Sequence, residues 1–252
     1  MKQISYYILE RLHINKDISN YYNYHPTTRD ELQELVDKLV KERGNEADLN
    51  DIDTSKITDM NYIFYNSKFN GDISEWDVSN VKNMSYIFYD SKFTGKNGDI
   101  SNWDVSNVKD MESMFYRSKF NGDISKWDVS KVEDMSFMFG NSSFTGENGD
   151  ISNWDVSNVE DMSYMFSNSK FNGDISKWDV SNVKDMNSMF ESSEFNGDIS
   201  NWDISNVEDM MYMFCNSKFD GDISQWDVSN VEDMRSMFYK SPLEKNPPKW
   251  YK

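Results

Sequence analysis

The chain has 252 residues, of which 37% are hydrophobic and 15% aromatic, so it has enough apolar side chains for a continuous core. Its 44 acidic residues outnumber 26 basic ones and give a formal net charge of -18 at pH 7. This charge disfavours nucleic acid as a partner, because phosphates would be repelled. No stretch is apolar enough to span a bilayer, and the first residues lack a secretory signal pattern. We therefore expect no membrane insertion and a cytoplasmic or virion-associated location.

Residues 1–44 are predicted to form an N-terminal helical cap. The sequence TRDE at residues 28–31 has the form of a capping box, and one apolar stripe follows it and ends before Gly44. The stripe consists of Leu32, Leu35, Val36, Leu39 and Val40. We expect this helix to cover the first coil of the repeats. Residues 1–25 hold a second amphipathic stretch, which either extends the cap or docks onto a partner.

Residues 45–241 consist of about eight copies of one repeat, marked by tryptophans 24 or 27 residues apart. The tryptophans are Trp76, Trp103, Trp127, Trp154, Trp178, Trp202 and Trp226, and Trp250 follows after the repeats. A repeat of this length is one supersecondary unit that buries its apolar face only by stacking on its neighbours. Function is therefore expected on a repetitive surface.

The spacing of apolar residues within one copy predicts two elements. Trp76 and Val78 alternate with polar residues, which predicts a short strand with both side chains buried. Met84, Ile87 and Phe88 are three and four residues apart, which predicts a helical turn with one apolar face. The sequence thus predicts an α/β solenoid, each coil having one short parallel strand and one short helix. The tryptophan and methionine columns are expected to be core.

The repeat has the consensus sequence G-D-I-S-x-W-D-V-S-N-V-x-D-M-x-x-M-F. This sequence resembles the short repeat of mycoplasma and listeria surface lipoproteins, which is related to BspA-like leucine-rich repeats. The resemblance covers roughly residues 45–241. It implies right-handed, leucine-rich-repeat-like coils used for binding or adhesion. It also implies a location at the cell surface.

Residues 242–252 are predicted to form a C-terminal cap. Leu243 takes the place of the repeat's phenylalanine, and Trp250 takes the place of its tryptophan. Pro247 and Pro248 stand where Ile223 and Ser224 stood one coil earlier. Because proline cannot donate a backbone hydrogen bond, we expect the two prolines to stop the sheet.

Aspartates recur at two positions and would form columns, since neighbouring coils lie about 4.8 Å apart. One column follows the tryptophans and consists of Asp77, Asp104, Asp128, Asp155, Asp179, Asp203 and Asp227. The other follows the turn glycines and consists of Asp72, Asp99, Asp123, Asp150, Asp174, Asp198 and Asp222. In one interpretation each carboxylate accepts hydrogen bonds from backbone N–H groups or from nearby Ser and Asn. In the other, the first column binds calcium, a cation that takes about six to eight oxygen ligands.

The sequence gives little indication of catalysis. Its two histidines, His13 and His25, precede the repeats, and neither a P-loop nor a Cys/His metal-ligand spacing occurs. General acid–base catalysis needs two carboxyls in unequal environments, whereas each acid here recurs in equivalent copies. We therefore expect no enzymatic activity and no cofactor.

The copies differ most just after the helical Met and Phe, where many aromatic side chains stand. The candidate partner-binding residues are Tyr62, Tyr86, Tyr89, Tyr116, Phe137, Tyr164, Tyr212 and Tyr239. Variable positions are expected to face solvent, and tyrosines are common interface anchors. We predict a monomeric, protein-binding repeat scaffold that contacts its partner through this variable ridge or the polar strand face. The alternatives are a structural spacer docked by residues 1–25 and a calcium- or glycan-dependent adhesin.

Overall fold

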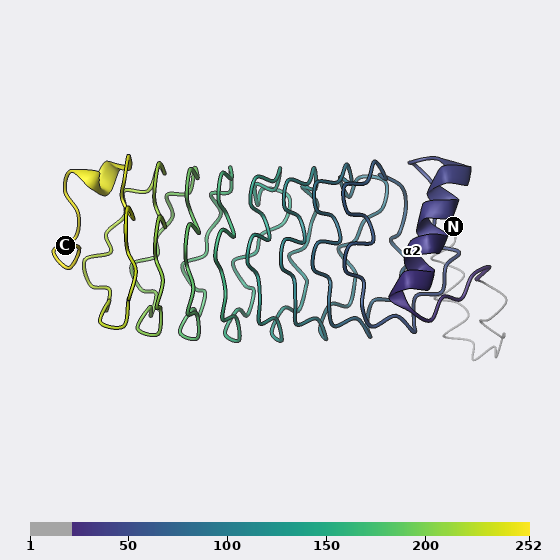
Figure 1. Ribbon diagram of the computed structural model, residues 1–252, viewed down its shortest axis with the longest axis horizontal. Helices are drawn as coiled ribbons and strands as arrows, with labels where there is room; N and C mark the ends of the chain where they lie inside the picture. The colour runs from purple at the N-terminus through teal and green to yellow at the C-terminus, as the bar shows by residue number, and fades with distance from the viewer. Residues whose placement is uncertain (1–21) are drawn as a thin grey trace.

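The computed structural model describes residues 22–252 and shows one stack of coils along a single long axis (Figure 1). Helix α2 (Arg29–Arg43) lies across the N-terminal end, and the short 3-10 helix η2 (Pro242–Glu244) lies at the other end. Among the described residues these are the only helices, and β-structure is limited to isolated parallel bridges. The amphipathic stretch predicted within residues 1–25 falls almost entirely outside the described residues.

The predicted α/β solenoid of strand-plus-helix coils is wrong, because each coil turns where a helix was expected. Two non-glycine residues per coil have a positive φ, such as Tyr164 at 56° and Asn168 at 51°. An α-helix needs a negative φ at every residue, and so does a strand. The i, i+3, i+4 spacing still buries Met162, Met165 and Phe166, since successive turns place all three inside. The expected strand is also a turn, in which the Trp178 N–H donates to the Ile175 carbonyl at 3.2 Å.

A regular ladder of backbone hydrogen bonds joins the coils through one eight-residue segment in each coil, which we call a rung. The rungs are residues 59–66, 83–90, 110–117, 134–141, 161–168, 185–192, 209–216 and 233–240. In each of the first seven rungs, four alternate N–H groups donate to carbonyls of the next rung at 2.7–3.1 Å, as Phe166 does to Met189. The N–H groups between them close turns inside the rung, as Met165 does with Met162. These rung-to-rung donors all point the same way along the stack, while in the second to seventh rungs the residue two places before the first donor bonds the preceding coil, as the Lys184 N–H does with the Glu160 carbonyl at 2.8 Å.

The tryptophan segments are attached to each other by side chains. Each indole Nε1 donates to a backbone carbonyl of the preceding coil at 2.9–3.2 Å, as Trp178 does to Ile151. Repeat asparagines make similar bonds, and Asn182 Nδ2 donates to the Ser157 carbonyl at 2.6 Å. The tryptophan column is buried up to Trp226, which confirms its predicted place in the core.

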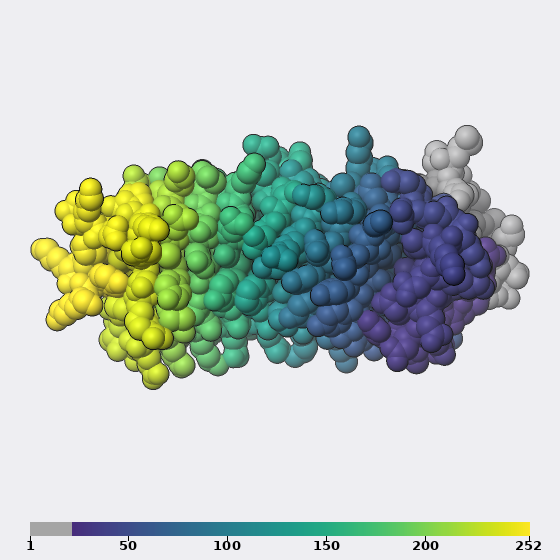
Figure 2. Space-filling view, turned by 45° about the horizontal axis from the view of Figure 1, so that its top comes forward, coloured from purple at the N-terminus to yellow at the C-terminus, as the bar shows by residue number. Residues whose placement is uncertain are grey.

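Two columns of phenylalanines fill the interior beside the tryptophans and methionines. Phe166 and Phe190 stack with ring centroids 5.9 Å apart, and Phe171 and Phe195 stack at 6.4 Å. All four rings are fully buried. Figure 2 shows one face of the elongated molecule, on which side chains of successive coils lie against one another. The dry core is thus a continuous stack of rings in which each coil contacts mainly its two neighbours.

Helix α2 covers the first rung, as the sequence predicts. Thr28 is its N-cap and accepts a hydrogen bond from the Glu31 N–H at 3.2 Å. The Glu31 carboxylate reaches back to the Thr27 N–H at 2.7 Å. Leu32, Val36 and Leu39 are buried, and the helix ends at Arg43, with Gly44, whose φ is 91°, as its C-cap. The apolar stripe therefore packs on the end of the core, away from water.

Pro247 and Pro248 do not stop the ladder, contrary to the prediction. The residues that they replace, Ile223 and Ser224, donate no backbone hydrogen bond to another coil. The chain instead continues the tryptophan column, because Trp250 stacks on Trp226 at 6.4 Å. The ladder itself ends at the last rung, residues 233–240.

The indole hydrogen bonds predict a stability effect that can be measured. Trp154→Phe keeps a ring in the column but leaves the Ile124 carbonyl, which Trp154 bonds at 3.2 Å, without its donor. A buried carbonyl left unpaired costs about 1–3 kcal/mol, so we expect a loss of this size in urea unfolding followed by circular dichroism. Trp250→Phe is the control, with a smaller loss, because half-buried Trp250 lies where water can replace the donor. Equal losses would contradict the account.

Candidate functional site

Five tyrosines form one connected aromatic surface on the first three rungs, which we call the tyrosine ridge. They are Tyr62, Tyr65, Tyr86, Tyr89 and Tyr116. Tyr62 is 39% exposed and Tyr65 is 47% exposed, while the other three are half-buried. Exposed aromatic side chains in contact with one another are unusual on a surface with no binding role.

The spacing of the rungs positions these rings. Tyr62 and Tyr86 occupy the same place on successive rungs and stack with centroids 4.6 Å apart and planes 3° apart. Tyr65, Tyr89 and Tyr116 form a second stack with spacings of 4.9 and 5.0 Å. Rings held in such stacks have already lost much of their rotamer freedom, so a partner would lose less entropy by ordering them.

The other predicted partner-binding residues are placed differently. Phe137 and Tyr164 stack at 4.3 Å, and Phe137 meets Tyr116 edge-on at 5.8 Å, so this pair extends the ridge. Tyr212 and Tyr239 are 38% and 50% exposed, and no aromatic ring of the described residues stacks on either. Tyr65 is not among the predicted residues, although its place in the rung is that of Tyr89. The structure thus gathers six of the eight candidates into one surface and leaves two apart.

A cavity of about 230 Å³ opens between α2 and the ridge. Its lining includes Val36, Asp37 and Val40 from the helix and Tyr65 and Asn66 from the first rung. The ridge therefore continues into a concave site at the N-terminal end of the stack.

A third acidic column, which the sequence analysis missed, lies at the start of the rungs. It consists of Asp59, Asp110, Asp134, Asp161, Asp185, Asp209 and Asp233, with Asn83 in the same column. Parallel bridges join its successive members, and each side chain accepts the N–H two residues on, as Asp161 does from Ser163 at 2.8 Å. The sequence D-M, which occurs in every repeat except the one with Asn83, was the available signal, but a predicted helix does not place these acids side by side.

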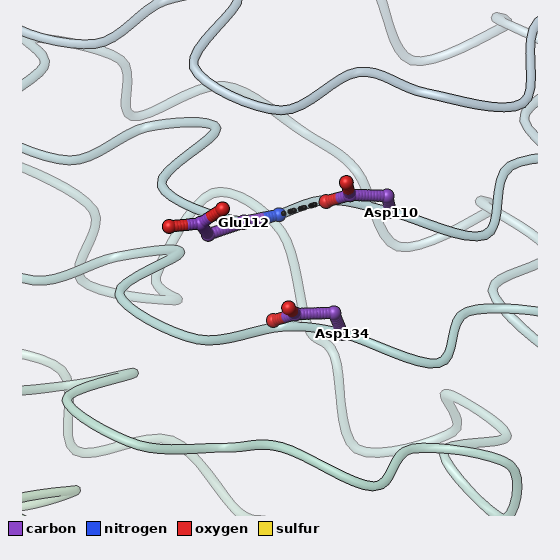
Figure 3. A group of neighbouring side chains, drawn as sticks. All are labelled: Asp110, Glu112 and Asp134. Carbon is purple, nitrogen blue, oxygen red and sulfur yellow. Dashed lines mark hydrogen bonds between the residues drawn. The ribbon is translucent and has the colours of Figure 1, made fainter.

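Three acids come closest together where this column meets Glu112 (Figure 3). Asp110, Glu112 and Asp134 each offer a carboxylate oxygen within 4.8 Å of the others, the only such trio among residues 22–252. The Glu112 N–H donates to Asp110 at 2.9 Å, and the Tyr86 hydroxyl donates to the Glu112 carboxylate. Burial raises the pKa of Asp110 and of Glu112, and the neighbouring carboxylates add to both shifts. Carboxylate oxygens at this spacing are suitable ligands for a hard divalent cation.

The predicted calcium column after the tryptophans has a different environment. Asp128 accepts hydrogen bonds from the Ser130 hydroxyl at 2.6 Å and the Ser130 N–H at 3.1 Å, and the same local turn recurs along the column. These bonds hold the pKa of Asp128 and of Asp203 below the ordinary value. The arrangement supports the structural interpretation of this column, while calcium binding there stays a prediction.

The acidic column predicts that the protein becomes more stable on mild acidification. Burial, with the charges of Asp161 and Asp209, raises the pKa of Asp185 from 3.8 to about 6. The folded chain therefore binds this proton more tightly than the unfolded chain, so stability rises as pH falls from above about 6 toward about 4. Urea unfolding at successive pH values measures this rise.

Asp185→Asn should flatten the rise, because asparagine keeps the local hydrogen bond, as Asn83 does with the Ser85 N–H at 2.8 Å. Asp179→Asn removes the same charge from the aspartate column that follows the tryptophans. In this variant the free energy of unfolding should still rise as the pH falls. A wild-type free energy of unfolding that falls steadily between pH 7 and pH 5 would contradict the prediction.

The fold and its repeated surface define a repeat protein built from stacked, hydrogen-bonded coils. Residues 31–148 and 141–250 match the model of a family described as "Mycoplasma protein of unknown function, DUF285", and the chain belongs to this family. The match confirms the resemblance to a mycoplasma repeat family, whereas the relation to BspA-like repeats stays a prediction. No curated protein and no solved structure matches the chain.

In residues 22–252, no helix combines the length and hydropathy needed to cross a bilayer.

Proposed function

We propose that the chain is a non-enzymatic repeat scaffold that binds a protein partner through the tyrosine ridge. The observation that supports this proposal is the contact of five partly exposed tyrosines across three successive rungs. Tyrosine is enriched at the energetic centres of protein interfaces, because its ring buries much apolar area and its hydroxyl can still form a hydrogen bond.

The surroundings of the ridge favour a partner with a complementary polar rim. Glu112 and Asp110 lie beside Tyr86 on one side, and the adjacent cavity contains Asp37. The chain as a whole carries a net charge of -18. A basic rim on the partner would speed the encounter and fix its orientation, while the tyrosines would supply most of the affinity.

The proposal predicts that partner capture depends on the ridge. We expect Tyr65→Ala/Tyr89→Ala to weaken capture at least about tenfold, since truncating a tyrosine at the energetic centre of an interface costs about 2 kcal/mol or more. Neither residue has a positive φ, so the change does not alter the rung's strained positions. Pull-down from cell extract with the purified chain as bait, quantified by mass spectrometry, measures the loss.

Tyr239→Ala is the control, because it removes a tyrosine that is 50% exposed, has no positive φ and stacks on no aromatic ring of the described residues. It should capture the same proteins as the wild type. Loss of capture in this control, with capture retained by the ridge variant, would refute the ridge as the contact surface.

A calcium-dependent adhesin is the second candidate, supported by the trio of Asp110, Glu112 and Asp134. A thermal melt in calcium or in EDTA separates the two functions. The scaffold predicts the same melting temperature in both. A melting temperature that is higher in calcium than in EDTA for the wild type, but not for Asp110→Asn/Asp134→Asn, would favour the adhesin.

A further inference from the structure

The stack of Tyr65, Tyr89 and Tyr116 ends at the cavity beside α2. Tyr89 has a ring on each face, because Tyr65 lies 4.9 Å away on one side and Tyr116 lies 5.0 Å away on the other. Tyr65 belongs to the first rung, so its second face is turned toward α2, and it lines the cavity of about 230 Å³ together with Asp37. Tyr62 contacts Tyr65 at a tilt of 53°, and no second ring of the described residues stacks on Tyr65. The cavity therefore has an open aromatic face.

The Tyr65 carbonyl belongs to a row of acceptors that α2 covers in part. In each later rung the equivalent carbonyl accepts an N–H of the preceding rung at 2.7–3.0 Å. On the first rung the row faces α2 instead, where Arg29 Nε donates to the Asn61 carbonyl at 3.0 Å. Gln33 Nε2 donates to the Ile63 carbonyl at 3.1 Å. No group in residues 22–252 donates to the Tyr65 carbonyl, so this acceptor at the cavity is unpaired within the described chain.

The charge at the cavity is negative. Asp37 is exposed and is the one Asp, Glu, Lys, Arg or His in the lining. Its carboxylate accepts a hydrogen bond from Gln33 Nε2 at 3.1 Å, and no Lys, Arg or His of the described part of the chain forms an ion pair with it. The whole chain carries a net charge of -18. The chemistry of the cavity therefore matches a cation with several N–H donors.

The chain's own cations indicate how a tyrosine at this place of the rung is used. Tyr116 and Tyr239 occupy the same place as Tyr65 in their rungs. Arg117 lies over the Tyr116 ring with its Cζ 5.5 Å from the centroid, and Lys240 lies over the Tyr239 ring with its Nζ at 5.1 Å. Tyr65 is followed by an asparagine, so the chain supplies no such cation at the cavity.

We propose that the cavity binds the guanidinium of an arginine side chain on the protein partner. The proposal rests on the proposed function, because Tyr65 belongs to the tyrosine ridge. A guanidinium is planar and carries only donors, so it can stack on Tyr65 while its N–H groups bond the Asp37 carboxylate and the Tyr65 carbonyl. Val36 and Val40 line the same cavity and would contact the methylene groups of the arginine.

An NMR titration of the full chain with a small probe tests this site without a known partner. The probe is a tripeptide with arginine between two glycines, blocked at both ends. We expect saturable shifts of the backbone amides at 36–40 and 63–67, with a Kd of about the millimolar range. The citrulline tripeptide keeps the shape without the charge and should bind at least about fivefold more weakly. The lysine tripeptide should also bind more weakly, because an ammonium lacks the planar fork of donors.

Variants assign the binding to the cavity. Asp37→Asn keeps an acceptor for Gln33 but removes the charge, and it should weaken arginine binding about threefold or more. Glu34→Gln is the matched control, because it removes the same charge from an exposed residue of α2 that does not line the cavity. It should bind as the wild type does. Three results would overturn the proposal: no saturable shift at these amides, equal binding of the arginine tripeptide and either of the other two, or an equal loss in both variants.

The pull-down separates this proposal from the proposed function. Asp37→Asn should capture the same proteins about threefold more weakly, and Glu34→Gln should capture them as the wild type does. Full capture by Asp37→Asn, with capture lost in Tyr65→Ala/Tyr89→Ala, would overturn the arginine site and leave the ridge as the contact surface. Selective binding of the arginine tripeptide with no protein captured would support the arginine site and count against the ridge alone.

Discussion

The one-way ladder of backbone hydrogen bonds between rungs is the interaction on which the other features of the structure depend. It exists because two residues in each rung have a positive φ, which turns the chain so that alternate N–H groups face the next coil. Each such non-glycine residue costs about 1–2 kcal/mol. Four ladder bonds contribute about 0.5–1.5 kcal/mol each, so they offset the strain only where a neighbouring rung is present. The strain is therefore tolerated only in a stack.

The same geometry produces both the core and the candidate binding surfaces. The turns place methionine and phenylalanine inside, where the phenylalanine rings stack from coil to coil, and they bring large residues with positive φ, such as Tyr62 and Tyr86, to the surface. When that outward residue is tyrosine on adjacent rungs, as at Tyr62 and Tyr86, the rung spacing brings the rings into stacking contact. The acidic column follows from the same repetition, since each rung begins at a bridge to the next. Side chains that recur at the same place on successive rungs therefore form columns on the surface of this protein.

Much of the packing could be predicted from the sequence, because a repeated apolar pattern identifies buried positions whatever the backbone does. The burial of Trp76, Val78 and Phe88 and the cap at Thr28 followed from spacing and capping chemistry. The backbone conformation of the coil could not be predicted from the sequence, because the spacing of Met84, Ile87 and Phe88 occurs both in a helix and in a run of turns. Only the positive φ at positions such as Tyr86 distinguishes them, and tyrosine is not a residue that signals a left-handed conformation. The acid trio was missed for the same reason, since it depends on which residues the rungs bring side by side.

Scalar couplings across hydrogen bonds, measured by NMR on deuterated, isotope-labelled chain, test the ladder most directly. The account predicts a coupling from the amide nitrogen of Tyr164 to the carbonyl carbon of Asn187, and another from Phe166 to Met189, each linking two coils. A coupling from Phe166 to the carbonyl of Met162 in its own coil would instead show an α-helix. That result would contradict the ladder and, with it, the placement of the tyrosine ridge and of the acidic column.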